Sequence, residues 1–237
     1  MSDIYKSGKY LEATGRTWHS EDSPWKAKQI INIIRKNSLH PKHIAEIGCG
    51  AGQILAELSN EEYLGDTEFE GYDISPKAIE MCEKIDSKKC KFFCQDLLTG
   101  KNEKSRNFDV LLVIDVFEHV HDYMGFVEQC RHKGNYKIYH IPLDIHVSSV
   151  LRNSLIRSRY SIGHLHYFTA DSAIATLKDT GHEIIDYFYT NGSSGVFKHH
   201  PSIKTAIANC PRWIFSKLSL PFTARVWGGY SLLVLAK

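Results

Sequence analysis

Three glycines on alternating positions mark the stretch of this chain that is best suited to bind a ligand. Residues 44–55 read Ile-Ala-Glu-Ile-Gly-Cys-Gly-Ala-Gly-Gln-Ile-Leu, with Gly48, Gly50 and Gly52 between two apolar segments. Glycine adopts positive φ without strain and allows a ligand to approach the backbone closely. The first N–H groups of the helix that follows have no partner within the helix and attract polar or anionic groups. The pattern predicts a strand, a tight turn and a helix that bind a nucleotide.

The spacing of the glycines limits which nucleotide we expect. The dinucleotide fingerprint Gly-x-Gly-x-x-Gly requires a third glycine at position 53 or 55, and these positions hold Gln53 and Leu55. A phosphate-binding P-loop requires Gly-Lys-Ser or Gly-Lys-Thr, and neither triplet occurs in the sequence. A glycine-rich turn of some other α/β protein is the alternative for this stretch taken alone.

Each of the next three predicted strands has an aspartate at or near its end. These residues are Asp73 at the end of the strand at 69–73, Asp96 near the end of 91–97, and Asp115 at the end of the strand at 108–115. Asp73 lies a little beyond the ~20-residue offset at which α/β nucleotide sites place a carboxylate against ribose hydroxyls. Its two oxygens can accept both hydroxyls of a cis-diol. Ile74 follows it, in position to contact the face of an adenine.

The elements that must position these residues alternate between strand and helix. Ser23-Pro24 is typical of a helix start, and the almost continuously apolar run at 108–114 is typical of a strand covered on both faces. The alternation predicts a parallel sheet whose ligand crevice lies at the carboxyl ends of the strands. Further strands are predicted at 137–142, 182–190 and 229–235, and further helices at 122–132, 169–177 and 202–219.

Taken in order, these motifs resemble those of the class I S-adenosylmethionine-dependent methyltransferases. The resemblance rests on Glu46-x-Gly48-x-Gly50-x-Gly52, Asp73, Gln95-Asp96-Leu97 and Asp115-Val-Phe-Glu118-His119, and it covers residues 40–190 and the strand at 229–236. It implies that residues 48–52, including Cys49, hold the methionine part of the cofactor and that Glu46 supports the turn. It further implies that Asp73 binds the ribose, that Asp96 binds the adenine amino group, that Leu97 packs on the ring, and that Asp115 closes the methionine side.

The same resemblance implies the fold and the cofactor. We expect an α/β, Rossmann-like, doubly wound seven-stranded sheet, mostly parallel with an antiparallel last strand, and helices on both faces. The cofactor would be S-adenosylmethionine and its product S-adenosylhomocysteine. The branch that it resembles includes ubiquinone-type O-methyltransferases and small-molecule or sugar methyltransferases. The chain would be one domain (1–237), with an N-terminal lid and helix (1–37), a substrate-side insertion (143–168) and a helical segment (196–228).

His119 is the candidate for catalysis. It follows the fourth strand, beside the expected methyl group, and imidazole titrates near neutrality, so that it can act as a base toward an acceptor hydroxyl. The alternative is that His119 is a structural residue packed on a neighbouring loop. Four further candidates for this role are His140, His146, His164 and His166. On the substrate side we expect four residues, namely Trp18, His146, Arg152 and His166.

A metal-dependent alternative rests on Asp115-x-x-Glu118-His119. This run resembles the Glu-x-x-Glu-His metal motif of small-RNA 3′-end 2′-O-methyltransferases, with Asp115 in place of the first Glu. Glu118, His119 and His166, or His164 in place of His166, would then bind a divalent ion, Mn²⁺ or Zn²⁺ rather than Mg²⁺. Our principal hypothesis has no metal, because Asp115 already has a role toward the cofactor and the Glu-His pair occurs in metal-free relatives.

Composition restricts the other classes of function. The formal net charge is +2 and no run of Lys or Arg stands out, so we do not expect a nucleic-acid partner, and the cluster Arg152, Arg157 and Arg159 is the only support for an RNA substrate. The six cysteines contain no Cys-x-x-Cys pair, and the first residues lack a signal-peptide core, which indicates a cytoplasmic location without a transmembrane segment. We predict an enzyme that methylates a small molecule, with a non-catalytic binding module or a dehydrogenase as alternatives.

Overall fold

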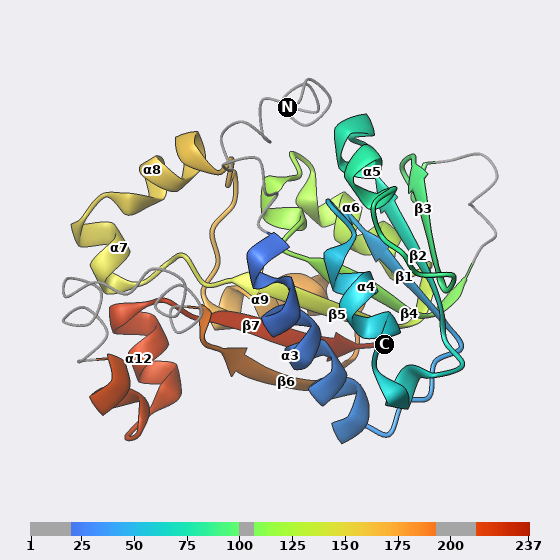
Figure 1. Ribbon diagram of the computed structural model, residues 1–237. Helices are drawn as coiled ribbons and strands as arrows, with labels where there is room; N and C mark the ends of the chain where they lie inside the picture. The colour runs from blue at the N-terminus through green and yellow to red at the C-terminus, as the bar shows by residue number, and fades with distance from the viewer. Residues whose placement is uncertain (1–19, 100–106, 193–211) are drawn as a thin grey trace.

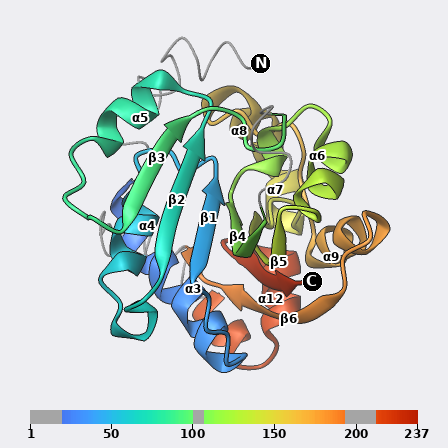
Figure 2. The same cartoon turned by 90° about the vertical axis from the view of Figure 1, so that its right-hand side faces the viewer.

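The computed structural model describes residues 20–99, 107–192 and 212–237, which form a three-layer α/β arrangement around one sheet (Figure 1). The seven strands lie in the order β3-β2-β1-β4-β5-β7-β6. Figure 2 shows β3, β2, β1 and β4 side by side in this order. The strands are β1 (His43–Ile47), β2 (Glu68–Asp73), β3 (Cys90–Cys94), β4 (Phe108–Ile114), β5 (Gly134–Pro142), β6 (Ile184–Thr190) and β7 (Ser231–Ala236).

The strand pairings confirm the predicted fold class. β1 pairs in parallel with β2 and β4, β2 with β3, and β4 with β5. β7 runs antiparallel to both of its neighbours, β5 and β6. The order reverses direction at β1 and β4, and in doubly wound sheets the ligand crevice lies at such a switch point, outside the carboxyl ends of the strands.

Helices cover both faces of the sheet and bury its apolar side chains. They are α3 (Ser23–Lys36), α4 (Gln53–Ser59), α5 (Pro76–Cys82), α6 (Tyr123–Cys130), α7 (Val147–Leu151), α8 (Ser154–Ser161), α9 (Ala170–Asp179) and α12 (Leu220–Trp227), with short 3₁₀ turns at Ser20–Asp22, Glu62–Leu64 and Phe117–His119. Isoleucines of α3 and leucines of α4 pack on one face, and α6 and α9 pack on the other. Both faces of β4 are therefore buried, as its continuous apolar sequence requires.

The N-terminal helix follows its sequence signals. α3 begins at Ser23-Pro24 and presents Ile30, Ile31, Ile33 and Ile34 to the core, all at most 3% exposed. Its buried stripe has the helical period that the sequence predicts. The first turn of α3 reaches the ligand crevice, where Trp25 and Lys26 lie beside the glycine turn.

The helices of two regions differ from those that the sequence predicts. The predicted insertion at 143–168 contains α7 and α8, which extend away from the sheet together with α12 (Figure 1). The predicted helix at 202–219 lies mostly outside the described residues. In its described part, residues 212–216 are helical, Lys217 and Leu218 form a turn, and Ser219 caps α12, whose first turn contains Pro221. The division into a single domain with these appendages stays a prediction.

Candidate functional site

The glycine turn lies between β1 and α4, at the carboxyl end of a central strand. Gly48, Gly50 and Gly52 have φ of +70°, +53° and +72°, a region that costs other residues roughly 1–2 kcal/mol. A Cβ at Gly48 would lie 2.8 Å from Cγ2 of Val116, and one at Gly52 would lie 2.6 Å from Cε1 of Phe92. Both the backbone conformation and the space therefore require glycine, and the turn presents backbone to the crevice.

Asp73, the last residue of β2, braces this turn. Its Oδ2 accepts a hydrogen bond from the N–H of Gly50 at 3.0 Å, and its Oδ1 accepts one from the N–H of Ser75 at 2.8 Å. Burial raises the pKa of the Asp73 carboxyl, while the backbone donors oppose the rise. The N–H of Gly48 donates to the carbonyl of Tyr72 at 2.7 Å. The turn and the end of β2 therefore form one hydrogen-bonded unit.

A cavity of about 340 Å³ lies between the glycine turn, the first turn of α3 and the carboxyl ends of β4 and β5. This volume is near the lower end for small-molecule sites, which run from roughly 300 to 1,000 Å³. The wall combines the backbone of residues 48–51 with ionisable side chains. These side chains include Asp22, Lys26, Glu46, Asp115, His119, His140 and His164.

Asp115, one residue beyond β4, is held by two basic groups. Its carboxylate lies 2.8 Å from Nζ of Lys26 and 2.6 Å from Nδ1 of His140. Burial opposes ionisation of this carboxyl, but His140 and Lys26 together outweigh it and hold the pKa of Asp115 well below its usual range. Nε2 of His140 lies 2.9 Å from the hydroxyl of Thr190 at the end of β6. The network ties α3, β4, β5 and β6 together at the cavity.

Glu46 points from β1 to the cavity behind the glycine turn. The residue is 1% exposed, and its Oε2 has no hydrogen-bond partner among the described residues. Burial raises its pKa to about 8, although Lys26 opposes the rise. At neutral pH Glu46 therefore retains its proton and can donate a hydrogen bond. A buried polar atom without a partner in a cavity wall is suited to a polar group of a bound ligand.

His119 and His164 line the opposite side of the cavity, and Glu118 lies close to both. Each offers one ligand-type atom, and the three atoms lie within 4.8 Å of one another. Glu118 is 1% exposed, and neither of its carboxylate oxygens has a hydrogen-bond partner in the described part of the chain. Burial and the nearby Asp115 raise the pKa of Glu118 well above its usual range. Two imidazoles and a carboxylate in this arrangement can hold Zn²⁺ or Mn²⁺.

The two histidines of this cluster are oriented by groups behind them. Nδ1 of His119 lies 3.0 Å from the carbonyl oxygen of Gly163, and Nδ1 of His164 lies 2.5 Å from Oδ2 of Asp144. Because a carbonyl only accepts, neutral His119 carries its proton on Nδ1, and Nε2 is its basic nitrogen. Burial, with His164 beside it, lowers the pKa of His119 to about 4. The ring is therefore neutral at pH 7.

Comparison with known protein families identifies the kind of domain that contains this cavity. Residues 45–133 match a family model described as a methyltransferase domain. The matched stretch contains the glycine turn, Asp73, Asp115 and the Glu118-His119 pair. Residues 45–133 therefore carry a methyltransferase domain, in agreement with the family that the sequence motifs resemble.

Relatives of the methyltransferase domain agree with this assignment. The ubiquinone biosynthesis O-methyltransferase of Idiomarina loihiensis is 24% identical over 153 residues, which span 60% of this chain and 61% of the relative. The N-methyltransferase NodS of Bradyrhizobium japonicum WM9, solved with S-adenosylhomocysteine, has a TM-score of 0.56 at 14% identity, covering 89% of this chain and 84% of its own. The plantazolicin methyltransferase BpumL, solved with a triazolic desmethylPZN analogue and S-adenosylhomocysteine, has a TM-score of 0.57 at 18% identity, covering 99% of this chain and 93% of its own.

These comparisons confirm the predicted family and fold. The matched family is the predicted class of enzyme domain, and two of the structural relatives were solved with S-adenosylhomocysteine. The chain spans about three fifths of the length of the curated relative. Within the residues that the structure describes, no helix is both long enough and apolar enough to cross a bilayer.

The residues predicted at the adenosine end lie outside the cavity wall of the methyltransferase domain. Ile74 is 38% exposed, and Leu97 is fully buried in the core. Asp96 accepts hydrogen bonds from the N–H of Leu98 and the hydroxyl of Thr99, both at 2.9 Å. The roles of these residues toward adenine stay predictions.

Two of the residues predicted on the substrate side are engaged locally. His146 caps α7, where its Nδ1 accepts a hydrogen bond from the N–H of Ser149 at 3.0 Å. Arg152 donates through Nε to the carbonyl of Ser148 at 2.9 Å. Neither residue is part of the cavity wall, and Trp18 lies outside the described residues.

The ring of His166 does not join the cluster of Glu118 and His119, where the metal-dependent alternative places it. Its Nε2 lies 3.0 Å from the carbonyl oxygen of Val120 and 3.2 Å from that of His121, and its ring packs against Tyr123. The ring nitrogen is therefore engaged by a backbone turn. The structure brings His164 into the cluster with Glu118 and His119 instead.

Sequence reasoning missed Lys26, which binds Asp115 across the cavity. Lys26 lies on α3 four residues before Ile30, on the buried stripe of the helix. A basic residue on an otherwise apolar helical face is the signal that identifies it. Its neighbour Trp25 also lines the cavity and packs edge-on against His140 with ring centroids 5.9 Å apart.

Proposed function

We propose that this methyltransferase domain transfers a methyl group from S-adenosylmethionine to a hydroxyl of a small molecule, with His119 as general base. The observation that carries the proposal is that His119 and the backbone of the glycine turn line the same cavity of about 340 Å³. Donor and acceptor can therefore meet in one enclosed space. The oxygen acceptor is argued from this histidine, since the relatives above include both N- and O-methyltransferases.

The residues of the glycine turn fit the cofactor. The bare backbone at residues 48–52 leaves room that a Cβ would fill at Gly48 and Gly52, and Glu46 supplies a buried polar group with an oxygen that lacks a partner among the described residues. Asp73 would bind the ribose while it braces the turn. When bound, the cofactor supplies an electrophilic methyl group on a sulfonium.

The protein contributes mainly position, because the positive charge of the sulfonium is lost in the transition state. Asp115 would close the methionine side, and Lys26 and His140 fix its carboxylate within 2.8 Å of both basic groups. These contacts hold an aspartate with φ of +53°, a conformation uncommon for residues other than glycine. Lys26 and His140 would therefore keep the Asp115 carboxylate in place when the cofactor is replaced by its product.

His119 would accept the proton of the acceptor hydroxyl through Nε2. The carbonyl of Gly163 holds the proton on Nδ1 and fixes the ring. With a pKa lowered to about 4 by burial, the ring is ready to accept at neutral pH, although it is a weaker base than free imidazole. This role requires His119 to affect the chemical step and not the binding of the cofactor.

Calorimetry tests the cofactor site. We expect wild-type protein to bind S-adenosylhomocysteine, and Asp73→Asn to weaken binding by about 1.5–3 kcal/mol, roughly ten- to a hundredfold, because a charged acceptor to the ribose hydroxyls is lost. The amide introduced by this change retains one acceptor oxygen for the turn. Asp86→Ala, at an exposed aspartate of the segment before β3, is the matched control and should bind like the wild type. Wild-type protein that binds neither cofactor nor product would contradict the proposal.

Kinetics test the base. His119→Gln should lower kcat by roughly 10²–10⁴-fold, the usual contribution of a general base, with the affinity for S-adenosylhomocysteine unchanged. His132→Gln, at an exposed histidine after α6, should leave both quantities unchanged. An equal loss of cofactor affinity in His119→Gln would assign the residue a structural role instead.

A metal-assisted transfer to the 2′-hydroxyl of RNA is the second candidate, and the Glu118 cluster favours it. A buried carboxylate whose oxygens have no hydrogen-bond partner among the described residues, next to two imidazoles, is suited to a divalent ion. Asp144 and the Gly163 carbonyl would serve as the groups that orient the two histidine ligands. A bound ion would lower the pKa of the acceptor hydroxyl, and His119 would then act as a ligand.

Metal analysis separates the two candidates. Stoichiometric Zn²⁺ or Mn²⁺ in purified protein, lost in Glu118→Gln together with activity, would favour the metal-assisted reaction. Binding to RNA should then weaken steeply with salt. Full activity after treatment with a chelator would retain His119 as the base.

A further inference from the structure

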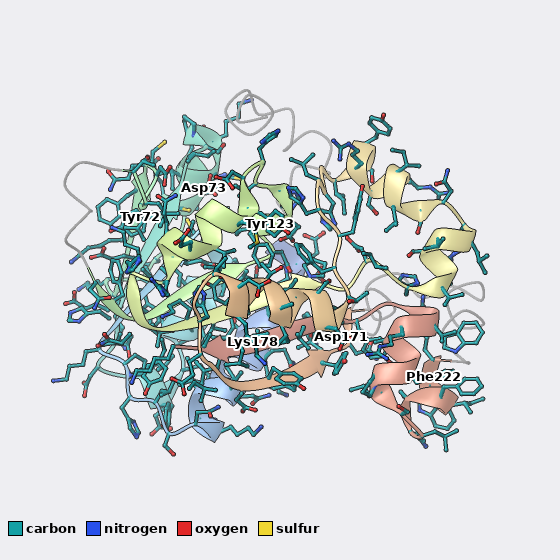
Figure 3. All side chains as sticks on the ribbon, turned by 180° about the vertical axis from the view of Figure 1, so that it is seen from behind. Tyr72, Asp73, Tyr123, Asp171, Lys178 and Phe222 are labelled. Carbon is teal, nitrogen blue, oxygen red and sulfur yellow. The ribbon has the colours of Figure 1, made fainter. Side chains whose placement is uncertain are left out.

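Helices α7, α8 and α12 form an outer group beside the sheet. Figure 1 shows all three on the same side of the molecule, and Figure 3 shows Phe222 of α12 at the end of the view opposite Tyr72 and Asp73. α7 contacts both α8 and α12, and the hydroxyl of Ser148 donates to the carbonyl of Trp227 at 3.3 Å. We call α7, α8, α12 and residues 212–219 the outer helical group.

This group exposes large apolar side chains. Leu151 is 81% exposed, Tyr160 83% and Leu218 78%, and Val150, Trp213 and Phe222 are each more than half exposed. An apolar groove also runs between α7 and α12, beside Val147 and Arg225. Single exposed apolar residues are normal, but a contiguous apolar patch on a soluble protein marks a surface that contacts something else.

The outer helical group is also basic. Residues 145–168 contain Arg152, Arg157 and Arg159 and no Asp or Glu, and residues 212–230 contain Arg212, Lys217 and Arg225 and no Asp or Glu. The whole chain is nearly balanced, with 29 Lys and Arg against 27 Asp and Glu. Arg225 forms an ion pair with Asp171 of α9. The other five basic residues of these two segments concentrate positive charge where the apolar side chains are exposed.

We propose that the outer helical group docks on the surface of an anionic lipid bilayer. Exposed leucine and valine gain free energy from contact with acyl chains, Trp213 and Tyr160 are the residue types that prefer the bilayer interface, and the basic side chains are attracted by anionic headgroups. Helices of five to eight residues are far shorter than the ~20 residues of a span, so that they lie on the bilayer.

The apolar part of the surface favours a bilayer over RNA. A nucleic-acid surface combines basic side chains with aromatic residues on which bases stack. Here Val150, Leu151 and Leu218 are aliphatic and give a base no π-face. The same aliphatic residues are suited to insertion among acyl chains.

Vesicle flotation tests the proposal. Full-length protein is mixed with vesicles of phosphatidylcholine alone or of phosphatidylcholine with phosphatidylglycerol, and the bound fraction is measured at low and high salt. We expect binding to the anionic vesicles, with weaker binding to neutral vesicles and at high salt, because the charge term is screened. Absence of binding, or equal binding to both kinds of vesicle, would overturn the proposal.

Paired variants locate the surface. Leu151→Ser combined with Leu218→Ser should weaken partition to anionic vesicles by about tenfold, as apolar burial is lost. Arg157→Gln should weaken it by about fivefold, since one basic residue near an anionic surface contributes about 1 kcal/mol. Ile185→Ser on edge strand β6 and Lys91→Gln on β3 are the matched controls and should bind as wild type. Variants that bind as well as these controls would refute the assigned face.

Two further measurements test whether a second copy of the chain, or RNA, binds the outer helical group in place of a bilayer. Light scattering without vesicles would overturn the proposal if it showed a dimer that the Leu151→Ser and Leu218→Ser changes convert to a monomer. Tighter binding to single-stranded RNA than to anionic vesicles would also overturn it. Circular dichroism of each variant, identical to that of the wild type, ensures that a loss of binding reports on the surface and not on unfolding.

Discussion

On the β1–β2 side of the cavity the chain presents backbone, whereas on the β4–β5 side it presents ionisable side chains. The first side, the glycine half, consists of residues 46–52 and Asp73, and its shape is set by three positive φ values and by hydrogen bonds to β2. The second, the histidine half, contains Asp115, Glu118 and three histidines from three elements. Residues 48–51 of the glycine half and Asp115 and the three histidines of the histidine half line the same space.

This difference indicates that one half is built to bind a ligand and that the other is built to take part in a reaction. A surface of backbone N–H and C=O groups has a fixed donor and acceptor pattern, which suits a ligand that is always the same. Side chains can be exchanged one at a time without altering the chain path, and they carry groups that titrate. The glycine half is therefore suited to the cofactor, and the histidine half to the acceptor and its proton.

Removal of Lys26, the cation that pairs with Asp115 of the histidine half, should have the largest effect on the free energy of unfolding. Lys26→Met removes a cation 2.8 Å from the Asp115 carboxylate and leaves that charge with His140 alone. Breaking one side of a buried ion pair costs about 3–5 kcal/mol. Urea unfolding followed by circular dichroism should show a loss near the lower end of this range, because both side chains retain some exposure.

Two variants sharpen this test. Lys28→Met, two residues along α3 and exposed, should change the free energy of unfolding by less than about 0.5 kcal/mol. Lys26→Met combined with Asp115→Asn should recover part of the loss, since no isolated charge then remains. A double variant that is no more stable than Lys26→Met would show that the pairing is not the origin of the effect.

The glycine half should respond to an added Cβ rather than to a lost charge. Gly52→Ala introduces a Cβ at φ of +72°, 2.6 Å from the Phe92 ring and 2.8 Å from Ile85. Backbone strain and overpacking each cost about 1–3 kcal/mol, so we expect a loss of about 2–4 kcal/mol and weaker binding of S-adenosylhomocysteine. Gly192→Ala, where no atom lies within 4 Å of the new Cβ, is the control for stability. Equal stability of the two variants would contradict the strain argument.

The sequence predicts the glycine half in more detail than the histidine half, for a physical reason. Alternating glycines and an acid at a strand end are local patterns, and each follows from the backbone conformation that it permits. The antiparallel last strand was expected from the resemblance to a family, and the order of the strands was not predicted, since periodicity alone does not define it.

Contacts in the histidine half join residues that are far apart in the chain. His140 meets Thr190, 50 positions later, and Lys26 meets Asp115, 89 positions later. The choice between His164 and His166 depends on which side of an irregular segment each side chain takes, and no period defines that. The sequence therefore offered His166 or His164 as the further metal ligand beside His119, and the fold of residues 143–168 separates them.

Glu46, in the glycine half, should make the folded protein less stable as the pH rises. Burial raises the pKa of Glu46 from 4.5 to about 8, so the folded state binds a proton that the unfolded state has released between these values. Stability therefore decreases from about pH 4.5 to pH 8. Glu46→Gln removes this dependence, and its stability relative to wild type should increase by on the order of 2 kcal/mol between about pH 6 and pH 9. Urea unfolding at the two pH values measures the difference.

A matched glutamate checks the origin of that effect. Glu57→Gln, on α4 and at the surface beside Gln53, should show no change with pH relative to wild type. A pH dependence that persists in Glu46→Gln would mean that another group on this side of the cavity is responsible.

The smallest effect is expected at a histidine that lies in neither half. His182 is buried in the core, where its Nε2 lies 2.8 Å from the hydroxyl of Tyr139, and burial lowers its pKa from 6.5 to about 4. The unfolded state binds a proton in this range and the folded state does not, so stability decreases as the pH falls from about 6.5 toward 4. His182→Gln should remove about 1–2 kcal/mol of this acid sensitivity and leave kcat unchanged. His119 has nearly the same pKa from the same cause, yet it lines the cavity. A loss of kcat in His182→Gln as large as that in His119→Gln would show that burial, and not position in the cavity, determines which histidine the reaction requires.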